Sequence, residues 1–440
     1  MEILIKTLQF LLSLSILVFV HECGHFVAAR LFKTRVEKFY LFFNPWFSLF
    51  KFKRGDTEYG VGWLPLGGYV KISGMIDESM DKEQMQQEPQ PWEFRSKPAW
   101  QRLIIMIGGV SVNLIFAVFI YIFMLFLLGE SYLPAKNVKY GIVADSLAVD
   151  MGLRTGDKII KLDGSEVDDF MDITKDIILK DVKTITVERD SSIIDVKVPD
   201  GYIGKMLSNQ KGKFIGVRYP FIVQGFLDES IAQKAGITDG DHIVGIDTIE
   251  TWSFDEFRMK ISDFAGDSAT IWVVRAGQRL GFDLLIPENA TLGVYVKPLN
   301  ELLEFGKHEY SFLQAIPAGF VKTYETTVDY LKQLKLLFRK EVKATESLGG
   351  FISIGKIFSS TWDWVHFWSI TAFLSIILAV MNLLPIPALD GGHVMFLMYE
   401  IITGRKPSDK FLEYAQMVGM ILLLALLVFA NGNDIIRLFK

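Results

Sequence analysis

The fold is decided by the apolar stretch Leu11-Leu-Ser-Leu-Ser-Ile-Leu-Val-Phe-Val-His21-Glu22-Cys23-Gly24-His25-Phe-Val-Ala-Ala-Arg30, which carries ionisable side chains at its centre. Lys6 precedes the stretch as in a signal peptide, but no small-x-small cleavage site follows, and the apolar run continues directly into the histidines. We therefore predict a retained membrane-spanning helix. Histidine and glutamate are costly to hold in lipid, so a functional role explains them better than packing does.

The five residues from His21 to His25 fit the pattern H-E-x-x-H. On a helix this spacing places both imidazoles one turn apart on one face, with Glu22 beside them. Two imidazoles and one carboxylate, with water in the fourth position, suit catalytic zinc, and Glu22 would deprotonate that water. Cys23 points about 200° away from His21 on such a helix and is expected to face packing or lipid.

Working outward, four apolar segments stand out: Leu8 to about Phe32, Leu103 to Leu128, Phe367 to Leu384, and a shorter one from Ile421 to Ala430. A bilayer needs about 20 apolar residues per helix, which the second segment meets and the third just meets. The first and fourth depend on their flanking residues. We predict a polytopic α-helical membrane protein with about four transmembrane helices.

Basic residues indicate the orientation of these helices. Lysines and arginines gather between the first two segments, and Arg405, Lys406 and Lys410 stand between the last two. Cytoplasmic loops carry such an excess, and with four spans these two loops share a side. The region from about Glu130 to Phe358 is then expected to face outward.

That outward region contains an internal repeat. The stretch from Ser146 to Ile160, with Gly156-Asp157, matches the stretch from Ser230 to Val244, with Gly240-Asp241. Each copy predicts a short helix, a Gly-Asp turn and a β-branched strand. The pattern resembles tandem PDZ domains of the bacterial protease type, which are β-rich modules that can take up peptide ends by adding a strand. A generic αβ repeat without a peptide groove is the alternative.

Apolar residues recur at helical spacing after the repeat, from Phe312 through Phe320 and Leu331 to Phe338, with lysines between them. A basic amphipathic helix of this kind can lie along a membrane surface. Packing of the same apolar face against protein is an equally good interpretation.

A third metal ligand is expected late in the chain, in the stretch Asn382-Leu-Leu-Pro-Ile-Pro-Ala-Leu-Asp390-Gly-Gly-His393. Its two prolines break the helix and its two glycines let the backbone approach a neighbour. Asp390 would be a carboxylate at membrane depth, although it could instead cap the following helix. His393 could compete as a ligand, but two histidines and one aspartate already complete a catalytic zinc site that keeps one position open.

Together, H-E-x-x-H in the first span and N-x-x-P-x-P-x-L-D-G-G late in the chain resemble the site-2 protease family of intramembrane metalloproteases. Further similarity lies at 65–71, 108–113 and 348–354, so the resemblance covers nearly the whole chain. Val110 and Phe351 stand where family members often have proline, which affects loop geometry but no proposed ligand.

The resemblance implies specific roles. Zinc would be held by His21, His25 and Asp390, Glu22 would be the general base, and Asn382 would position the substrate backbone or the transition-state oxygen. Residues 58–72 would form a membrane-associated β-loop that binds an unwound substrate strand through Gly67, Gly68 and Tyr69.

The predicted order along the chain follows from these observations: a transmembrane helix over 1–33; a cytoplasmic-side loop with the β-hairpin over 34–102; a transmembrane helix over 103–128; PDZ-like modules over 129–219 and 220–300; an amphipathic membrane-surface segment over 301–360; a transmembrane helix over 361–403; and a fourth with its tail over 404–440.

The function implied is an intramembrane zinc endopeptidase of the bacterial inner membrane, which cuts single-span membrane proteins such as trimmed anti-sigma factors or remnant signal peptides. The alternative is a catalytically inactive, membrane-anchored PDZ scaffold or chaperone, against which the intact Glu22 argues. A metal transporter would require further ligand pairs along a path. The net charge of -5 and the absence of a long basic stripe or a paired-cysteine finger argue against nucleic acid as a partner. The single cysteine, Cys23, allows no intrachain disulfide.

Overall fold

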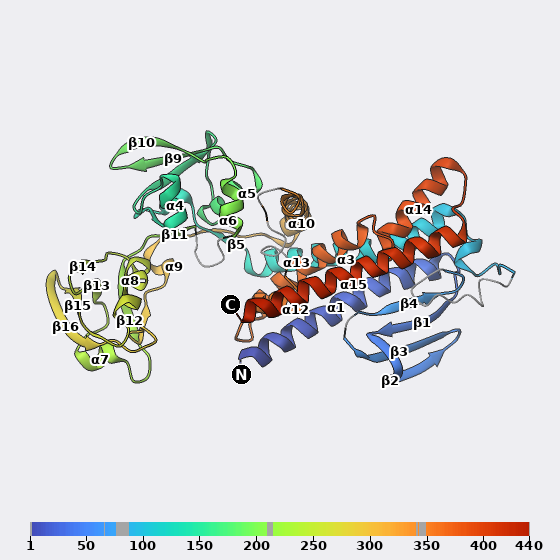
Figure 1. Ribbon diagram of the computed structural model, residues 1–440, viewed down its shortest axis with the longest axis horizontal. Helices are drawn as coiled ribbons and strands as arrows, with labels where there is room; N and C mark the ends of the chain where they lie inside the picture. Colours follow the sequence, from blue (N-terminus) through green and yellow to red (C-terminus); the bar gives the residue numbers. More distant parts are fainter. Residues whose placement is uncertain are drawn as a thin grey trace. The chain divides into compact units, whose positions relative to one another are not determined.

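The computed structural model describes residues 2–65, 67–75, 88–208, 214–339, 342 and 349–439. They divide into two compact units (Figure 1). Unit 1 consists of Met1–Gly129, Glu309–Phe338 and Ser347–Lys440, and unit 2 of Glu130–His308 and Arg339–Glu346. Leu66 and Leu348 of the quoted motifs, and parts of the segments 34–102, 129–219 and 301–360, lie outside the described residues.

Unit 1 is mainly helical. Its helices are α1 (Glu2–Leu31), α3 (Ala99–Leu128), α10 (Phe312–Leu336), α12 (Phe351–Ile357), α13 (Trp364–Leu383), α14 (Asp390–Thr403) and α15 (Asp409–Leu438). Within the described ranges, four of them, α1, α3, α13 and α15, are long and apolar enough to cross a membrane. The predicted number of spans is thereby confirmed. The fourth is far longer than its apolar centre at Ile421–Ala430, because polar residues extend the helix at both ends.

A four-stranded sheet follows α1 in the same unit. Its strands are β1 (Val36–Leu41), β2 (Phe43–Arg54), β3 (Thr57–Leu64) and β4 (Tyr69–Ile72), in the order β2-β3-β1-β4. β1 pairs in parallel with β3 and antiparallel with β4. β4 is therefore an edge strand among the described strands.

Small residues bring the helices of unit 1 close together. A Cβ added to Gly108 on α3 would lie 2.7 Å from the main-chain oxygen of Gly24 on α1, so the two backbones touch there. Small residues permit such close packing between membrane helices. On α13, Thr371 approaches Ser13 of α1, with 3.0 Å between the two hydroxyl oxygens.

Helix α10 has two different faces. Ala315, Gly319 and Thr323 are buried, and a Cβ on Gly319 would lie 2.5 Å from the Ile122 side chain of α3. The opposite side carries an exposed apolar stripe of Leu313, Phe320, Tyr324 and Leu331. Figure 1 shows α10 end-on, whereas α1 and α15 run across the view. Packing against protein is thus part of its role, and contact of the exposed stripe with a membrane surface stays a prediction.

Unit 2 is built from short strands and helices. Its strands are β5 (Glu130–Tyr132), β6 (Ile142–Ala144), β7 (Lys158–Leu162), β8 (Ser165–Glu166), β9 (Thr184–Arg189), β10 (Ser192–Lys197), β11 (Ile215–Val217), β12 (Phe221–Phe226), β13 (His242–Ile246), β14 (Ile249–Glu250), β15 (Ser268–Arg275), β16 (Gln278–Leu285), β17 (Val294–Val296) and β18 (Gly306–His308). Its helices are α4 (Ser146–Met151), α5 (Ile173–Leu179), α6 (Tyr202–Ser208), α7 (Ile231–Ala235), α8 (Phe254–Ile261) and α9 (Leu299–Leu302).

These elements form two modules with separate hydrophobic cores. The first contains the sheet β10-β9-β7-β8 and the pair β11-β6, and the second contains β16-β15-β13-β12-β17 with β14 beside β13. The helices α4 and α7 of the sequence repeat each end at a left-handed glycine, Gly152 and Gly236. β-rich modules are therefore present where the sequence repeats.

The repeat also extends to an ion pair. Asp157 accepts hydrogen bonds from the Arg189 guanidinium at 2.7 Å, and that guanidinium also donates to the carbonyl of Gly152 at 2.8 Å. Asp241 accepts in the same way from Arg275 at 2.7 Å, and Arg275 donates to the carbonyl of Gly236 at 2.9 Å. The same network thus ties the turn to a strand in both modules.

Candidate metal centre and its cleft

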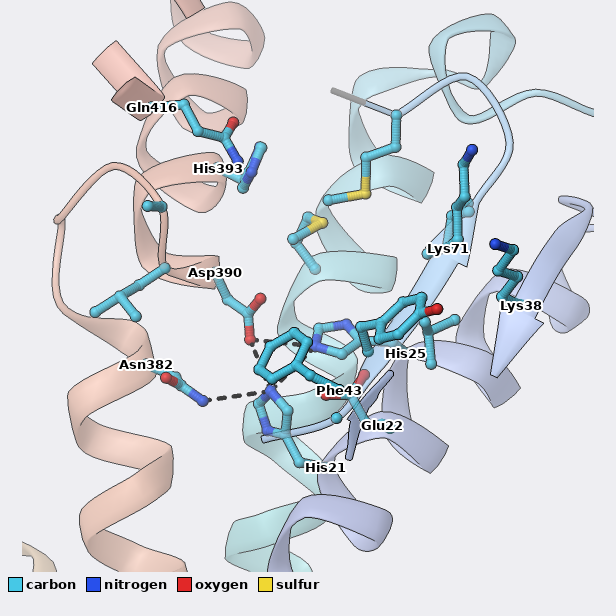
Figure 2. Close-up of a pocket in the computed structure, with 18 residues that line it drawn as sticks. His21, Glu22, His25, Lys38, Phe43, Lys71, Asn382, Asp390, His393 and Gln416 are labelled. Carbon is cyan, nitrogen blue, oxygen red and sulfur yellow. Dashed lines mark hydrogen bonds and ion pairs between the residues drawn. The ribbon is translucent and has the colours of Figure 1, made fainter. Parts of the chain in front are cut away.

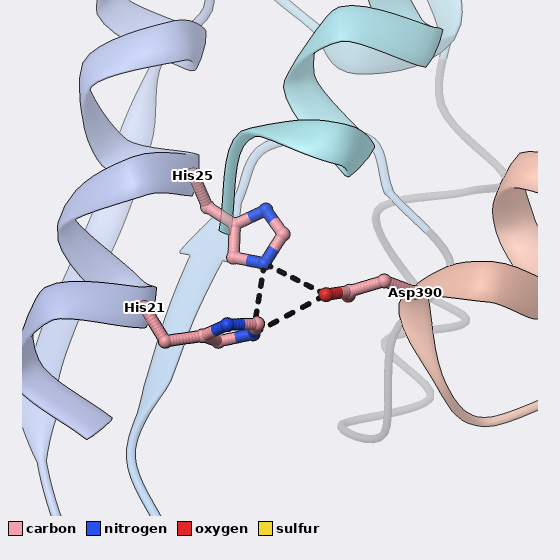
Figure 3. A group of neighbouring side chains, drawn as sticks. All are labelled: His21, His25 and Asp390. Carbon is pink, nitrogen blue, oxygen red and sulfur yellow. Dashed lines mark hydrogen bonds and ion pairs between the residues drawn. The ribbon is translucent and has the colours of Figure 1, made fainter. Parts of the chain in front are cut away.

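The two histidines of α1 point to one place. Their Nε2 atoms are 3.3 Å apart, and each lies 3.2 Å from Oδ2 of Asp390 (Figure 3). His21 and His25 are only 8% and 7% exposed. They form, with Asp390, the group of the described residues that can hold a metal ion. The helical spacing of H-E-x-x-H therefore gives the arrangement that it predicts.

Asp390 reaches this group through the break between α13 and α14. Ala388 adopts a left-handed φ of 82°, which costs a non-glycine residue about 1–2 kcal/mol. Gly392 packs against the loop, because a Cβ there would lie 2.6 Å from the carbonyl oxygen of Ile386. Asp390 is the first residue of α14 and follows the N-cap Leu389, so it does not cap the helix. Its carboxylate is turned toward the histidines instead.

The donor set and its spacing fit zinc. A tetrahedral zinc ion with bonds of about 2.0–2.2 Å places neighbouring ligand atoms about 3.3–3.5 Å apart. The three distances between the Nε2 and Oδ2 atoms, 3.2 to 3.3 Å, are close to this value. His25 also hydrogen-bonds through Nδ1 to the carbonyl of Ile105 at 2.9 Å, which leaves its Nε2 for a metal.

A cavity of about 500 Å³ opens beside the three side chains (Figure 2). Every predicted site residue except Gly67 lines it: His21, Glu22, His25, Gly68, Tyr69, Asn382 and Asp390. Gly67 is not among the lining residues, and a Cβ there would come 3.0 Å from the ring of Phe43. His393 lines the cavity as well, and the group of neighbouring ligand atoms does not include it.

Glu22 and Asn382 flank the metal group from different helices. Glu22 follows His21 on α1 and lines the cavity, and a Cβ on Gly68 would lie 3.3 Å from its Cγ. Asn382 is in the last turn of α13, with its Nδ2 3.3 Å from Nε2 of His21 (Figure 2). A carboxylate and an amide therefore stand within reach of anything bound beside the histidines.

The edge strand β4 forms one wall of the cavity. Tyr69, Val70, Lys71 and Ile72 of this strand all line it. The Tyr69 hydroxyl donates to Asn44 Oδ1 at 2.9 Å, and its ring stacks on Tyr40 at 5.4 Å between centroids. The strand is thus held by these side-chain contacts and by its pairing with β1, and it is the last strand in the described order of the sheet.

Several lining residues were missed by reasoning from the sequence, among them Phe43, Met106 and Gln416. Phe43 stacks on Tyr69 with 6.1 Å between ring centroids, and it follows Phe42, whose φ is 69°. Phe43 lies in an aromatic-rich stretch with no charge or motif, so no local pattern distinguishes it from its neighbours. Its position depends on the sheet register.

Comparison with known proteins adds to this geometry. The sequence profile described as peptidase family M50 matches residues 9–426. The protein named regulator of sigma E protease in Haemophilus influenzae is 30% identical over 452 residues, covering 98% of each chain. The regulator of sigma-E protease RseP of Escherichia coli is 31% identical over 456 residues, again covering 98% of each chain.

Proposed function

The chain belongs to peptidase family M50, the site-2 protease family, and is a zinc metalloendopeptidase; from this premise we propose that it cuts transmembrane segments of single-span membrane proteins. The observation that carries the proposal is that Asp390 meets His21 and His25 beside Glu22 on α1, a helix long and apolar enough to cross a membrane. The names of the relatives support a place in regulated intramembrane proteolysis.

The reaction follows from what these residues do. His21, His25 and Asp390 would hold the zinc ion, which when bound polarises the substrate carbonyl and lowers the pKa of water. Glu22 takes a proton from the attacking water and delivers it to the leaving amine. The Asn382 amide, near Nε2 of His21, donates a hydrogen bond to the oxygen on which negative charge develops.

The substrate is expected to bind as a strand. A peptide bond inside a helix is shielded, because its carbonyl is hydrogen-bonded within the helix. β4 is the last strand in the described order of its sheet, and a strand in that position can take up an unwound segment as a further strand through main-chain hydrogen bonds. Gly68 lets the chain before β4 pass close to β1 and α1, because a Cβ there would lie 2.7 Å from the Tyr40 carbonyl oxygen and would crowd Glu22. Gly67 does not line the cavity and enters the proposal only as the residue before Gly68.

The modules of unit 2 are proposed to be PDZ-like domains on the extracytoplasmic side of a bacterial inner membrane. Their duplicated helix-turn-strand unit supports this assignment, and the basic loops support the orientation. They contribute none of the described cavity residues. We expect them to select substrates by the size of the ectodomain and to bind peptide ends, while the exposed stripe of α10 rests on the membrane surface.

The test is cleavage of a model single-span protein by the purified chain, with the cut located by mass spectrometry. Glu22→Gln should retain zinc and lower the cleavage rate by about 10²–10⁴, because the general base is lost. Glu325→Gln is the matched control, because Glu325 is an exposed carboxylate of α10 in the same unit and does not line the cavity. Full activity of Glu22→Gln, or a cut only outside the span, would exclude the proposed mechanism.

A further inference from the structure

The stretch Gly108-Gly109-Val-Ser-Val-Asn113 of α3 passes directly behind the imidazoles. A Cβ on Gly109 would lie 2.5 Å from Nε2 of His25 and 2.7 Å from Cε1 of His21. Glycine at 109 therefore leaves the space that the two rings occupy. Asn113 follows four residues later, one helical turn away, and so lies on the same face of α3.

Asn113 is completely buried beside His21. Its side-chain Nδ2 lies 3.2 Å from Nδ1 of His21, while its Oδ1 has no hydrogen-bond partner among the described residues. Its main-chain carbonyl accepts a hydrogen bond from Ser375 of α13 at 2.8 Å. One turn of α3 thus contacts a proposed zinc ligand on α1 and is fastened to the helix that carries Asn382.

The chemistry of zinc binding decides which amide atom must face His21. The Nε2 atom of His21 points at His25 and Asp390, so the ring proton must be on Nδ1 when Nε2 binds zinc. A protonated Nδ1 is a donor and needs an acceptor. The amide nitrogen of Asn113 cannot accept, whereas its oxygen can. A half-turn of the amide exchanges these two atoms, which differ little in size and are assigned from their hydrogen bonds.

We propose that Asn113 is a positioning residue whose side-chain oxygen accepts the Nδ1 proton of His21 and so holds the ring in the zinc-binding tautomer. His25 shows the same arrangement, with its Nδ1 on the main-chain carbonyl of Ile105 at 2.9 Å. Metal-binding histidines generally use their second nitrogen in this way. Asn113 does not line the cavity, so it acts through His21 and not on the substrate.

The experiment measures the zinc dissociation constant of the full-length chain in detergent, by competition with a chromophoric chelator. Asn113→Leu removes both amide atoms at similar volume and should weaken zinc binding by about 10–100-fold. Asn113→Asp keeps an acceptor and removes the donor, so its affinity should stay near that of the wild type. Thr371→Val is the control, because it deletes a buried hydroxyl between α1 and α13 that is bonded to Ser13 and not to a proposed ligand.

The melting temperature of each metal-free variant separates metal binding from folding. Wild-type zinc affinity in Asn113→Leu would overturn the proposal. A folded Asn113→Asp that binds zinc about 10–100-fold more weakly than the wild type would also overturn it, since the amide would then act as a donor. This comparison with the wild type decides even where the leucine variant does not fold. The inference rests on the proposed zinc ligands, which His21→Ala tests separately. If His21→Ala binds zinc as tightly as the wild type, both the proposed zinc ligands and the role of Asn113 are wrong. If His21→Ala loses zinc while Asn113→Leu binds it tightly, only the role of Asn113 is wrong.

Discussion

Buried polar side chains are arranged differently in the two units. In unit 1, His25 and Asp390 are 365 residues apart in sequence and meet at one point, together with His21. In unit 2, Asp157 and Asp241 are buried as deeply, yet each closes a network inside its own module, and that network occurs twice. The repeated network stabilises each module of unit 2, whereas the group of His21, His25 and Asp390 in unit 1 can hold a metal ion.

Deletion of the two modules of unit 2 is expected to change substrate cleavage more than any other variant considered below. If unit 2 only selects substrates, replacing Lys139–Lys297 by a flexible linker should leave a short-stub substrate cleavable and make a substrate with a folded ectodomain cleavable for the first time. Gel-based cleavage of the two substrates measures this. If a truncated chain that is folded and zinc-loaded cuts neither substrate, unit 2 takes part in catalysis or in delivery of the substrate to the metal group.

Crowding the metal group should produce the next largest effect. Gly109→Ala places a Cβ 2.5 Å from Nε2 of His25, so a ring has to move, and zinc affinity should fall by about 10–100-fold. Zinc competition on the full-length chain provides the measurement. Gly355→Ala is a control in the same unit, because its added Cβ meets no atom within 4 Å. Equal zinc affinity in both variants would contradict the tight fit described for α3.

Removing one aspartate of the repeated network should destabilise a module without affecting zinc. Asp241→Asn weakens the bonds to Arg275 and should cost about 2 kcal/mol of local stability, and Asp157→Asn should cost a similar amount in the first module. Hydrogen exchange of β13 and β15, or of β7 and β9, reports each loss separately. If either variant changed the zinc affinity and left the stability of its module unaltered, the Asp–Arg networks of unit 2 would not be separate in function from the metal group of unit 1.

Acid should act on the second module, with the smallest effect. Burial acts to raise the pKa of the Asp241 carboxyl, but hydrogen bonds from Arg275 and Thr238 hold that pKa below its usual value. A depressed folded pKa stabilises the module above the unfolded value of about 3.9, and this stability is lost as pH falls toward the folded pKa. The protection factors of the β13 amides, taken relative to the intrinsic exchange rate at each pH, should therefore fall below about pH 4, and fall less in Asp241→Asn. An unchanged pH profile in that variant would show that another group controls the acid response.

Much of this architecture was predictable because its signals are local. A hydropathic run of sufficient length predicts a spanning helix, and H-E-x-x-H predicts two imidazoles on one helical face. The repeated Gly-Asp turns predict duplicated modules before any contact between them is known. The approach of Asp390 to His21 followed from the requirement of zinc for a third ligand, and the structure brings the two side chains to 3.2 Å.

The sequence by itself thus determined the number of spans, the duplication in unit 2 and the ligand types, since each depends on neighbouring residues. Only the tertiary structure decided that Gly67 does not line the cavity, that Phe43 does, and that Asn113 faces His21. These facts depend on how α3 crosses α1 and on the register of a sheet. Helix crossing and strand register are set by packing among segments distant in sequence, and no single segment encodes the position of its partner.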